Sequence, residues 1–322
     1  MNPYNTTSPV IFCIFNRPDT TQRVFNEIAK ARPPALYVVA DAARPQVLGE
    51  AELCQECRVI AERVDWPCEI TLDYAESNMG CKQRIYSGIS NAFKQFDFAI
   101  ILEDDCLPCP DFFRFVDTMR ERYQDDEQVM QIAGTAFIRP TKPKEAYYRS
   151  AYPLIWGWAT WRRAWDSFDP SMKAWPELKK KLELQVYAKS KLHERFIRYM
   201  EKAYQRRINT WDYPFVAHIL LQNGHCITPL YNLISNIGFG EGATHTKSSS
   251  NIHANLTFDN LPDPIPKNSA IKLDIDQSGI QLTNALYRKN FLQKRIDRLV
   301  SRARTLINSH EGRCNPNHNH AQ

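Results

Sequence analysis

Short apolar runs alternate with amphipathic stretches through the first 135 residues. Three β-rich runs, at 8–16, 35–41 and 68–74, are each followed by a stretch with helical spacing of apolar positions, and a fourth run begins at Phe98. Strands separated by helices of this length indicate βαβ units. The pattern therefore predicts an α/β fold with a mainly parallel central sheet flanked by helices.

The fourth apolar run ends abruptly in three carboxylates, Glu103, Asp104 and Asp105. The first run ends at Arg17 and the second at Asp41. Ligands of parallel sheets bind at the carboxyl ends of the strands, so we expect these polar side chains to gather along one edge. Adjacent carboxylates repel one another and lose hydration when buried, and this group therefore requires water, a cation or both.

Two explanations fit the acidic group. In the first, carboxylate oxygens bind magnesium or manganese, with Asp105 as the direct ligand of the ion. Such an ion neutralises the diphosphate of a nucleotide sugar. The alternative is an N-terminal cap for a helix expected at 111–123. Because a cap uses one carboxylate and three stand together here, the pattern favours the metal.

The segment "ESNMGCKQR" combines a loop at Gly80 with Lys82 and Arg84 at the start of the next helical stretch. Backbone amides and basic side chains at a helix start can bind phosphate. Basic residues in this position are also common on solvated surfaces. The phosphate-binding interpretation is therefore supported only by the metal site predicted nearby.

Asp212 stands between Trp211 and Tyr213 on the approach to another helix. It fits an N-terminal cap. It equally fits a general base, because desolvation by the flanking aromatic rings would raise its proton affinity.

Two further features have a functional and a structural explanation. His245 lies in the glycine-rich "FGEGATHT", where an imidazole can reach a metal, although single histidines in loops commonly have no such role. Five of the seven tryptophans lie between Trp156 and Trp175, and they form either core or a surface on which a sugar ring stacks.

The composition narrows the class of protein. A formal net charge of +5 over 322 residues is too small and too evenly spread to indicate nucleic acid. No apolar stretch reaches the length of a membrane span, and the first residues lack the pattern of a signal peptide, so we expect a cytoplasmic protein with reduced thiols.

The chain divides into an expected catalytic domain at 1–246 and an extension at 247–322. Within the domain we expect a nucleotide-sugar half at 1–135 and an acceptor half at 136–246. The extension ends in a basic amphipathic pattern at 284–308. This helix either lies on an anionic membrane, which would place the protein at the inner face, or docks on the domain with its basic face solvated.

Taken in this order, the motifs resemble the GT-A glycosyltransferases, and specifically the family of β-1,2-N-acetylglucosaminyltransferases similar to N-acetylglucosaminyltransferase I. The resemblance extends over roughly 9–246 and includes "FCIFNRPDTTQRV", "VVADAARP", "ILEDDCLPCPDFF" and "WDYPF" followed by "CITPLYNLISNIGF". The acidic segment is the most specific of these. The family's catalytic domain is lumenal and membrane-anchored, and this chain shows no anchor, which puts an N-glycan acceptor in doubt.

The resemblance implies a GT-A-type (Rossmann-like) fold and a role for each candidate residue. It implies that Arg17 and Asp41 contact the nucleotide base of the donor, and that Lys82 or Arg84 contacts its phosphates. The remaining assignments are donor ribose and sugar contacts for Glu103 and Asp104, a metal ligand at Asp105, a catalytic base at Asp212 and, following the wider GT-A pattern, a second metal ligand at His245.

The resulting hypothesis is a metal-dependent inverting glycosyltransferase of the hexosyltransferase class. It would use Mn2+ or Mg2+ and transfer a sugar, with GlcNAc as one candidate, from a UDP-sugar to a hydroxyl of a glycan, lipid-linked or protein acceptor. Two alternatives remain: a non-catalytic nucleotide-sugar-binding protein, and a metal-dependent nucleotidyltransferase. The sequence lacks a glycine-rich nucleotidyl signature after its first strand.

Overall fold

The computed structural model describes residues 4–139, 145–183, 191–239, 254–266 and 270–272. Within these residues a nine-stranded sheet has the order β11-β7-β9-β6-β8-β4-β1-β2-β3, and β5 and β10 form a separate antiparallel pair. The strands are β1 (Val10–Ile14), β2 (Ala35–Ala40), β3 (Glu69–Tyr74), β4 (Phe98–Glu103), β5 (Cys106–Pro108), β6 (Val129–Ala133), β7 (Tyr147–Ser150), β8 (Trp158–Trp161), β9 (His225–Pro229), β10 (Ile234–Asn236) and β11 (Ala270–Lys272). The helices are α1 (Pro18–Ala31), α2 (Glu50–Ala61), α3 (Cys81–Ala92), α4 (Pro110–Tyr123), α5 (Arg162–Asp166), α6 (Trp175–Glu183), α7 (Lys191–Tyr204) and α8 (Asp212–Leu221).

Most neighbouring strands in the first half are parallel, as the alternating pattern predicted. β1 pairs in parallel with both β2 and β4, and β2 pairs in parallel with β3. β8 is antiparallel to both β4 and β6, so β6 and its parallel neighbour β9 run in the direction of β4. The expected α/β fold with a mainly parallel central sheet flanked by helices is confirmed, and its GT-A-type character stays a prediction.

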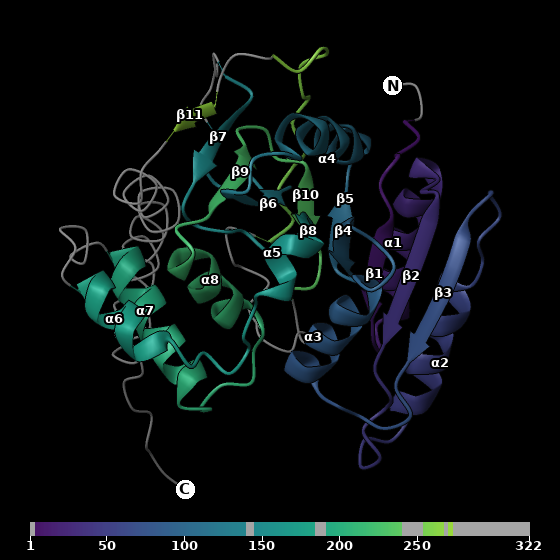
Figure 1. Ribbon diagram of the computed structural model, residues 1–322. Coiled ribbons are helices and arrows are strands. Elements are labelled where there is room, and N and C mark those ends of the chain that lie inside the picture. The colour runs from purple at the N-terminus through teal and green to yellow at the C-terminus, as the bar shows by residue number, and fades with distance from the viewer. Residues whose placement is uncertain (1–3, 140–144, 184–190, 240–253, 267–269, 273–322) are drawn as a thin grey trace, which may run out of the picture.

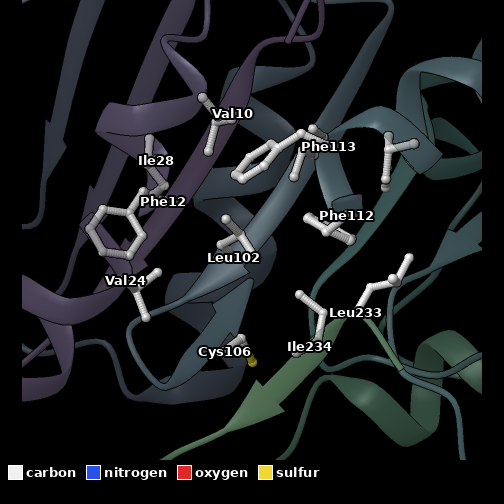
Figure 2. Packing of buried hydrophobic residues seen from close by; sticks show 14 of the residues in the cluster. Val10, Phe12, Val24, Ile28, Leu102, Cys106, Phe112, Phe113, Leu233 and Ile234 are labelled. Carbon is white, nitrogen blue, oxygen red and sulfur yellow. The ribbon is translucent and has the colours of Figure 1, made fainter. Parts of the chain in front are cut away.

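Strands β1, β2, β4 and β6 are buried on both faces because helices cover both, whereas the edge strand β3 is largely exposed. Side chains alternate along each strand, so Phe12 and Leu102 face α1 and α4, and Ile11 and Ile101 face α3 and α8. Figure 2 shows the first of these layers, where Leu102 lies among side chains from β1, α4 and β10. This double burial explains why the strand sequences are nearly continuous apolar runs.

The second half of the chain extends the same sheet. Figure 1 shows α6 and α7 on the side of the molecule away from β3, with α8 between them and α5, and a third cluster of buried apolar residues joins α6, α7 and α8. The charged stretch at 176–207 contains all but the first residue of α6 and the whole of α7.

Part of the predicted extension packs against the preceding part of the fold. Leu261 and Ile265 belong to the main core cluster, and β11 pairs in parallel with β7. Arg114 of α4 donates to the Leu261 carbonyl at 3.2 Å, and Arg122 donates to the Pro266 carbonyl at 2.8 Å. The boundary at 246 stays a prediction, but residues 254–266 share a core with the domain.

Two sequence-based expectations about membranes have different outcomes. Within the described ranges no helix combines the length and the apolar character that a membrane span needs. The basic stretch at 284–308 lies outside the described residues, so its membrane contact stays a prediction.

Candidate active site at the carboxyl end of β4

The acidic group stands where β4 leaves the sheet. Residues 98–102 of β4 are buried, whereas Glu103 is partly exposed and the Asp105 side chain is 16 % exposed. The alternation along β4 directs Glu103 toward the sheet face that α3 and α8 cover. The buried strand therefore presents its carboxylates at the edge where the sequence placed them.

The three carboxylates do not cap the helix that follows. The N-cap residue of α4 is Cys109, and it makes no side-chain cap bond. Asp111, in the first turn of α4, pairs instead with Arg114 at 2.9 Å. The capping explanation for the acidic group therefore does not hold.

Arg17, which precedes α1, forms ion pairs with two of the carboxylates. Its guanidinium bonds Asp104, and its Nη1 lies 2.9 Å from Asp105 Oδ2. The Asp104 side chain is 4 % exposed and the Arg17 side chain 26 %, so the carboxylate of this pair is almost entirely removed from water while the arginine still reaches it. Burial works to lower the pKa of Arg17, but Asp104 and Asp105 outweigh it and raise the pKa above its usual value.

One guanidinium does not balance three carboxylates. Burial, followed by the charges of Asp105 and Asp104, raises the pKa of Glu103 to about 8. Burial also raises the pKa of Asp104 to about 6, although Arg17 opposes this shift. The cluster thus carries an excess of negative charge at low exposure, which a divalent cation would relieve.

The segment after β10 encloses the acidic group, and sequence reasoning did not identify it. Asn236 pairs with Cys106 across the β5–β10 ladder, and the Ile237 amide donates to the Asp105 carbonyl at 2.8 Å. A Cβ atom at Gly238 would overlap Asp105 Oδ2 and lie 2.7 Å from Arg17 Nη1. Only a residue without a side chain fits here while that ion pair is formed.

Asp41 lies at the end of β2 and organises the loop that precedes α3. Its Oδ1 accepts from the Met79 amide at 2.9 Å, and its Oδ2 accepts from the Gly80 amide at 2.9 Å. The Asn78 amide group also donates to Oδ2, at 3.3 Å. Asp41 therefore reaches the expected edge, where its visible contacts are with this loop, and its contact with a base stays a prediction.

The two basic candidates at the start of α3 differ in their surroundings. Arg84 is buried, and its guanidinium bonds Asp73 and donates to the Ala40 carbonyl at 3.1 Å. Lys82 is partly exposed, and burial together with the nearby Arg206 lowers its pKa. The structure thus uses Arg84 to join α3 to β2 and β3, and Lys82 is the better placed of the two for a phosphate.

Asp212 is the first residue of α8, and it lies near the acidic group. Its N-cap neighbour is Trp211, whose ring stacks on Trp158 of β8 with centroids 5.5 Å apart. Asp212 Oδ1 accepts from the Tyr213 amide at 2.8 Å and from the Thr210 hydroxyl. The charge of Asp212 is also among the causes that raise the pKa of Glu103, so the two carboxylates share one electrostatic environment.

Two loops meet on the α3 side of the site. A Cβ atom at Gly80 would lie 3.3 Å from Asn209 Nδ2, so the loop before α3 touches the segment that leads to Asp212. Cys81 is exposed as a residue, but desolvation of its thiol, followed by the charges of Glu103 and Asp212, raises its pKa. The sequence gave no reason to include Cys81.

Only one of the two predicted metal ligands, Asp105, lies among the residues that the structure describes. Asp105 fits a ligand role by its carboxylate chemistry, its partial exposure and the charge excess around it. In the part of the chain that the structure describes, no group of three or more His, Cys, Asp and Glu side chains is arranged to hold a metal ion. His245 lies outside the described residues, so its ligand role stays a prediction.

Comparisons with known proteins add little to this geometry. No protein-family model matches the chain, and no curated protein matches its sequence. Similar solved structures include a UDP-glucose pyrophosphorylase complexed with UDP-glucose, at 10 % identity and a TM-score of 0.36 over 69 % of this chain and 90 % of that one. The mannosyltransferase PcManGT from Pyrobaculum calidifontis, in complex with GDP-Man and Mn2+, has 13 % identity and a TM-score of 0.36 over 68 % and 70 %.

A third similar structure is a CMP:2-keto-3-deoxy-manno-octonic acid synthetase complexed with CTP, at 12 % identity and a TM-score of 0.33 over 69 % of this chain and 89 % of that one. At these values the similarities carry no argument about activity. The resemblance to the β-1,2-N-acetylglucosaminyltransferase family therefore stays a prediction.

Proposed function

We propose that the protein uses a nucleotide sugar, and that it is a metal-dependent inverting glycosyltransferase which moves a sugar from a UDP-sugar to an acceptor hydroxyl. One observation supports this most strongly: the carboxyl end of β4 presents three carboxylates with a single balancing guanidinium, Arg17. The loops that carry Asp41 and Asp212 adjoin the same edge.

Asp105 would hold Mn2+ or Mg2+, with the donor's phosphate oxygens and water completing the coordination. A divalent ion in this place neutralises the diphosphate and stabilises the charge that develops as UDP leaves. Lys82, at the first turn of α3, contacts the same diphosphate, and the amino end of the helix favours the negative charge. Arg17 keeps Asp104 and Asp105 oriented toward the bound ion.

Asp212 acts on the acceptor side. The Thr210 hydroxyl and the Tyr213 amide both donate to its Oδ1, which fixes the orientation of the carboxylate. Asp212 Oδ2 then accepts the proton of the acceptor hydroxyl as the hydroxyl oxygen attacks the anomeric carbon. Attack from the side opposite the departing diphosphate inverts the anomeric configuration.

Binding and product analysis test this proposal together. Calorimetry should show UDP binding in Mn2+ that EDTA removes, and incubation with UDP-GlcNAc and other UDP-sugars should release UDP. Release of pyrophosphate from a nucleoside triphosphate and a sugar phosphate would identify the nucleotidyltransferase alternative. UDP binding with no release from any nucleotide sugar would identify the non-catalytic alternative.

A matched pair of variants tests the ligand role of Asp105. Asp105→Asn should weaken Mn2+-dependent UDP binding by about tenfold or more, because an amide is a poorer ligand for a hard cation. Asp97→Asn is the control, since Asp97 precedes the other end of β4 and its side chain is 89 % exposed. Equal UDP affinity in the two variants would refute the assignment.

A further inference from the structure

Three aromatic side chains from three different segments meet beside the acidic group. The Trp156 ring contacts Phe137 with centroids 5.4 Å apart and an interplanar angle of 71°. It contacts Phe239 with centroids 5.7 Å apart and an angle of 88°. All three residues are partly exposed, and Trp156 and Phe137 also pack against core clusters, so these rings, here called the Trp156 cluster, lie at the edge of the core with part of their surface exposed.

The segment after β10 places the Trp156 cluster next to the carboxylates. Phe239 directly follows Gly238, and a Cβ atom at Gly238 would overlap Asp105 Oδ2. The Trp156 ring contacts Phe239 and packs against the core layer that contains Cys106 and Ile234 of the β5–β10 pair. The cluster therefore borders the acidic group through Phe239.

The same strand connects the cluster to the proposed base. Trp158, two residues after Trp156, stacks on Trp211, and Asp212 follows Trp211 in the chain. Trp156 thus lies two residues from a strand residue that packs against the start of the helix that carries Asp212.

Backbone contacts hold Trp156 in place. Its carbonyl accepts from the Thr135 hydroxyl at 2.8 Å, and the next carbonyl, of Gly157, accepts from the Gly134 amide at 2.8 Å. Gly157 has φ 61°, and a side chain there would overlap Ile234. A ring fixed in this way binds a ligand without losing much conformational entropy.

We propose that the Trp156 cluster is the platform on which a sugar ring of the acceptor rests, so that the acceptor is a glycan. This inference rests on the function proposed above. Aromatic rings pack against the apolar C–H face of a pyranose while the hydroxyl groups at its rim remain free for polar contacts. The ring next to the acceptor hydroxyl would then lie between Trp156 and Asp212.

The residues around the Trp156 cluster favour a sugar acceptor over a lipid phosphate or a peptide. A lipid phosphate would bring negative charge close to three carboxylates that one arginine leaves partly unbalanced. A peptide strand would gain affinity from backbone pairing, and the described residues of this region, Trp156 and Phe239, contribute ring surface instead. A neutral, hydroxyl-rich ring suits both the aromatic and the acidic part of the site.

Saturation-transfer NMR tests the platform with defined probes. The methyl glycosides of β-glucose, β-galactose, β-GlcNAc and α-mannose would be offered to the protein with UDP and Mn2+, and farnesyl phosphate and a Ser/Thr peptide would be offered separately. We expect at least one glycoside to receive saturation at its ring protons. Trp156→Ala should weaken that binding by about tenfold or more, and Trp156→Phe should restore most of it.

Phe258→Ala is the matched control, because this aromatic side chain is 42 % exposed and makes no ring contact with the cluster among those observed. It should bind the glycoside like the wild type. Failure of every glycoside to bind, or equal binding by Trp156→Ala, would overturn the proposal. So would binding of only farnesyl phosphate or the peptide in a manner that depends on Trp156.

UDP release from the UDP-sugar in water separates this inference from the proposed function. That donor-side reaction needs no acceptor, and it is measured in the wild type and in the Phe258→Ala control. Loss of glycoside binding in Trp156→Ala, together with UDP release by the wild type, supports the platform, whereas absence of UDP release in the wild type counts against the transferase itself.

Discussion

Gly238 lies directly against the carboxylate of Asp105. A side chain at this position would overlap Asp105 Oδ2, and its Cβ would also lie 2.7 Å from Arg17 Nη1. These two residues are more than a hundred positions apart in the sequence, and the β5–β10 ladder brings them together. The acidic group is therefore completed by a segment that contributes no charge.

This relationship predicts that Gly238→Ala damages the site more than the fold. The added methyl group should displace Asp105 from Arg17 and weaken Mn2+-dependent UDP binding by about tenfold, or ~1.4 kcal/mol, in calorimetry. Gly49→Ala is the control, since with φ 77° it tests the effect of backbone strain alone, and nothing lies within 4 Å of the added Cβ. Wild-type UDP affinity in Gly238→Ala would show that the loop at 238 can move away from Asp105 without weakening the site.

The proposed base leads to a kinetic prediction. Asp212→Asn keeps the shape of the side chain and its bond from the Tyr213 amide, but it cannot accept the acceptor proton. Turnover should fall by roughly 100- to 10,000-fold, the usual contribution of general base catalysis, while UDP affinity stays unchanged. Asp125→Asn, at an exposed position after α4, should leave both quantities at wild-type values. Normal turnover in Asp212→Asn would remove this residue from the mechanism.

The strands and their acidic end could be predicted because both follow from local sequence. An apolar run with a polar terminus, such as the one from Phe98 to Asp105, indicates a buried strand that opens at one edge whatever the rest of the chain does. Asp41 and Arg17 reached the same edge because the carboxyl ends of parallel strands meet there.

Contacts between distant segments could not be predicted. The insertion of β8 antiparallel between β4 and β6 sets where Trp156 lies, and no local pattern encodes that pairing. Arg84 resembled a phosphate contact by position, and only the pairing of β2 with β3 shows that Asp73 stands beside it. Gly238 offered no signal at all until its neighbour was known.

A buried carboxylate outside the site predicts a loss of stability. Asp117 of α4 is 3 % exposed and accepts from the Thr6 hydroxyl, the Thr7 amide at 2.8 Å and the Ser8 hydroxyl at 2.6 Å. Asp117→Ala leaves these buried donors without their acceptor, so the free energy of unfolding should fall by about 3 kcal/mol. Urea denaturation measures this, and Glu121→Ala, on an exposed position of α4, should change it little. Similar values for the two variants would mean that the N-terminal segment does not depend on Asp117.

The ion pair between Glu50 and Arg44 predicts a pH dependence of stability. The bond from Arg44 lowers the pKa of Glu50 from 4.5 to about 2, against the opposing effect of burial. Because the folded protein then binds fewer protons than the unfolded chain, the pair stabilises fully above pH 4.5 and loses this effect as the pH falls through about 2. The Arg44 side chain is 46 % exposed, so solvent screening reduces its worth to about 1 to 2 kcal/mol.

Glu50→Gln measures this contribution directly. Its free energy of unfolding should lie below that of the wild type at pH 7, and the difference should shrink by about half or more at pH 3 because the wild-type advantage is then partly lost. Glu27→Gln is the control, because Glu27 pairs with a Lys30 side chain that is 63 % exposed. A Glu50→Gln difference that is the same at pH 7 and pH 3 would show that Glu50 acts through its neutral bonds, such as the one from Asn16 at 2.8 Å, and not through its charge.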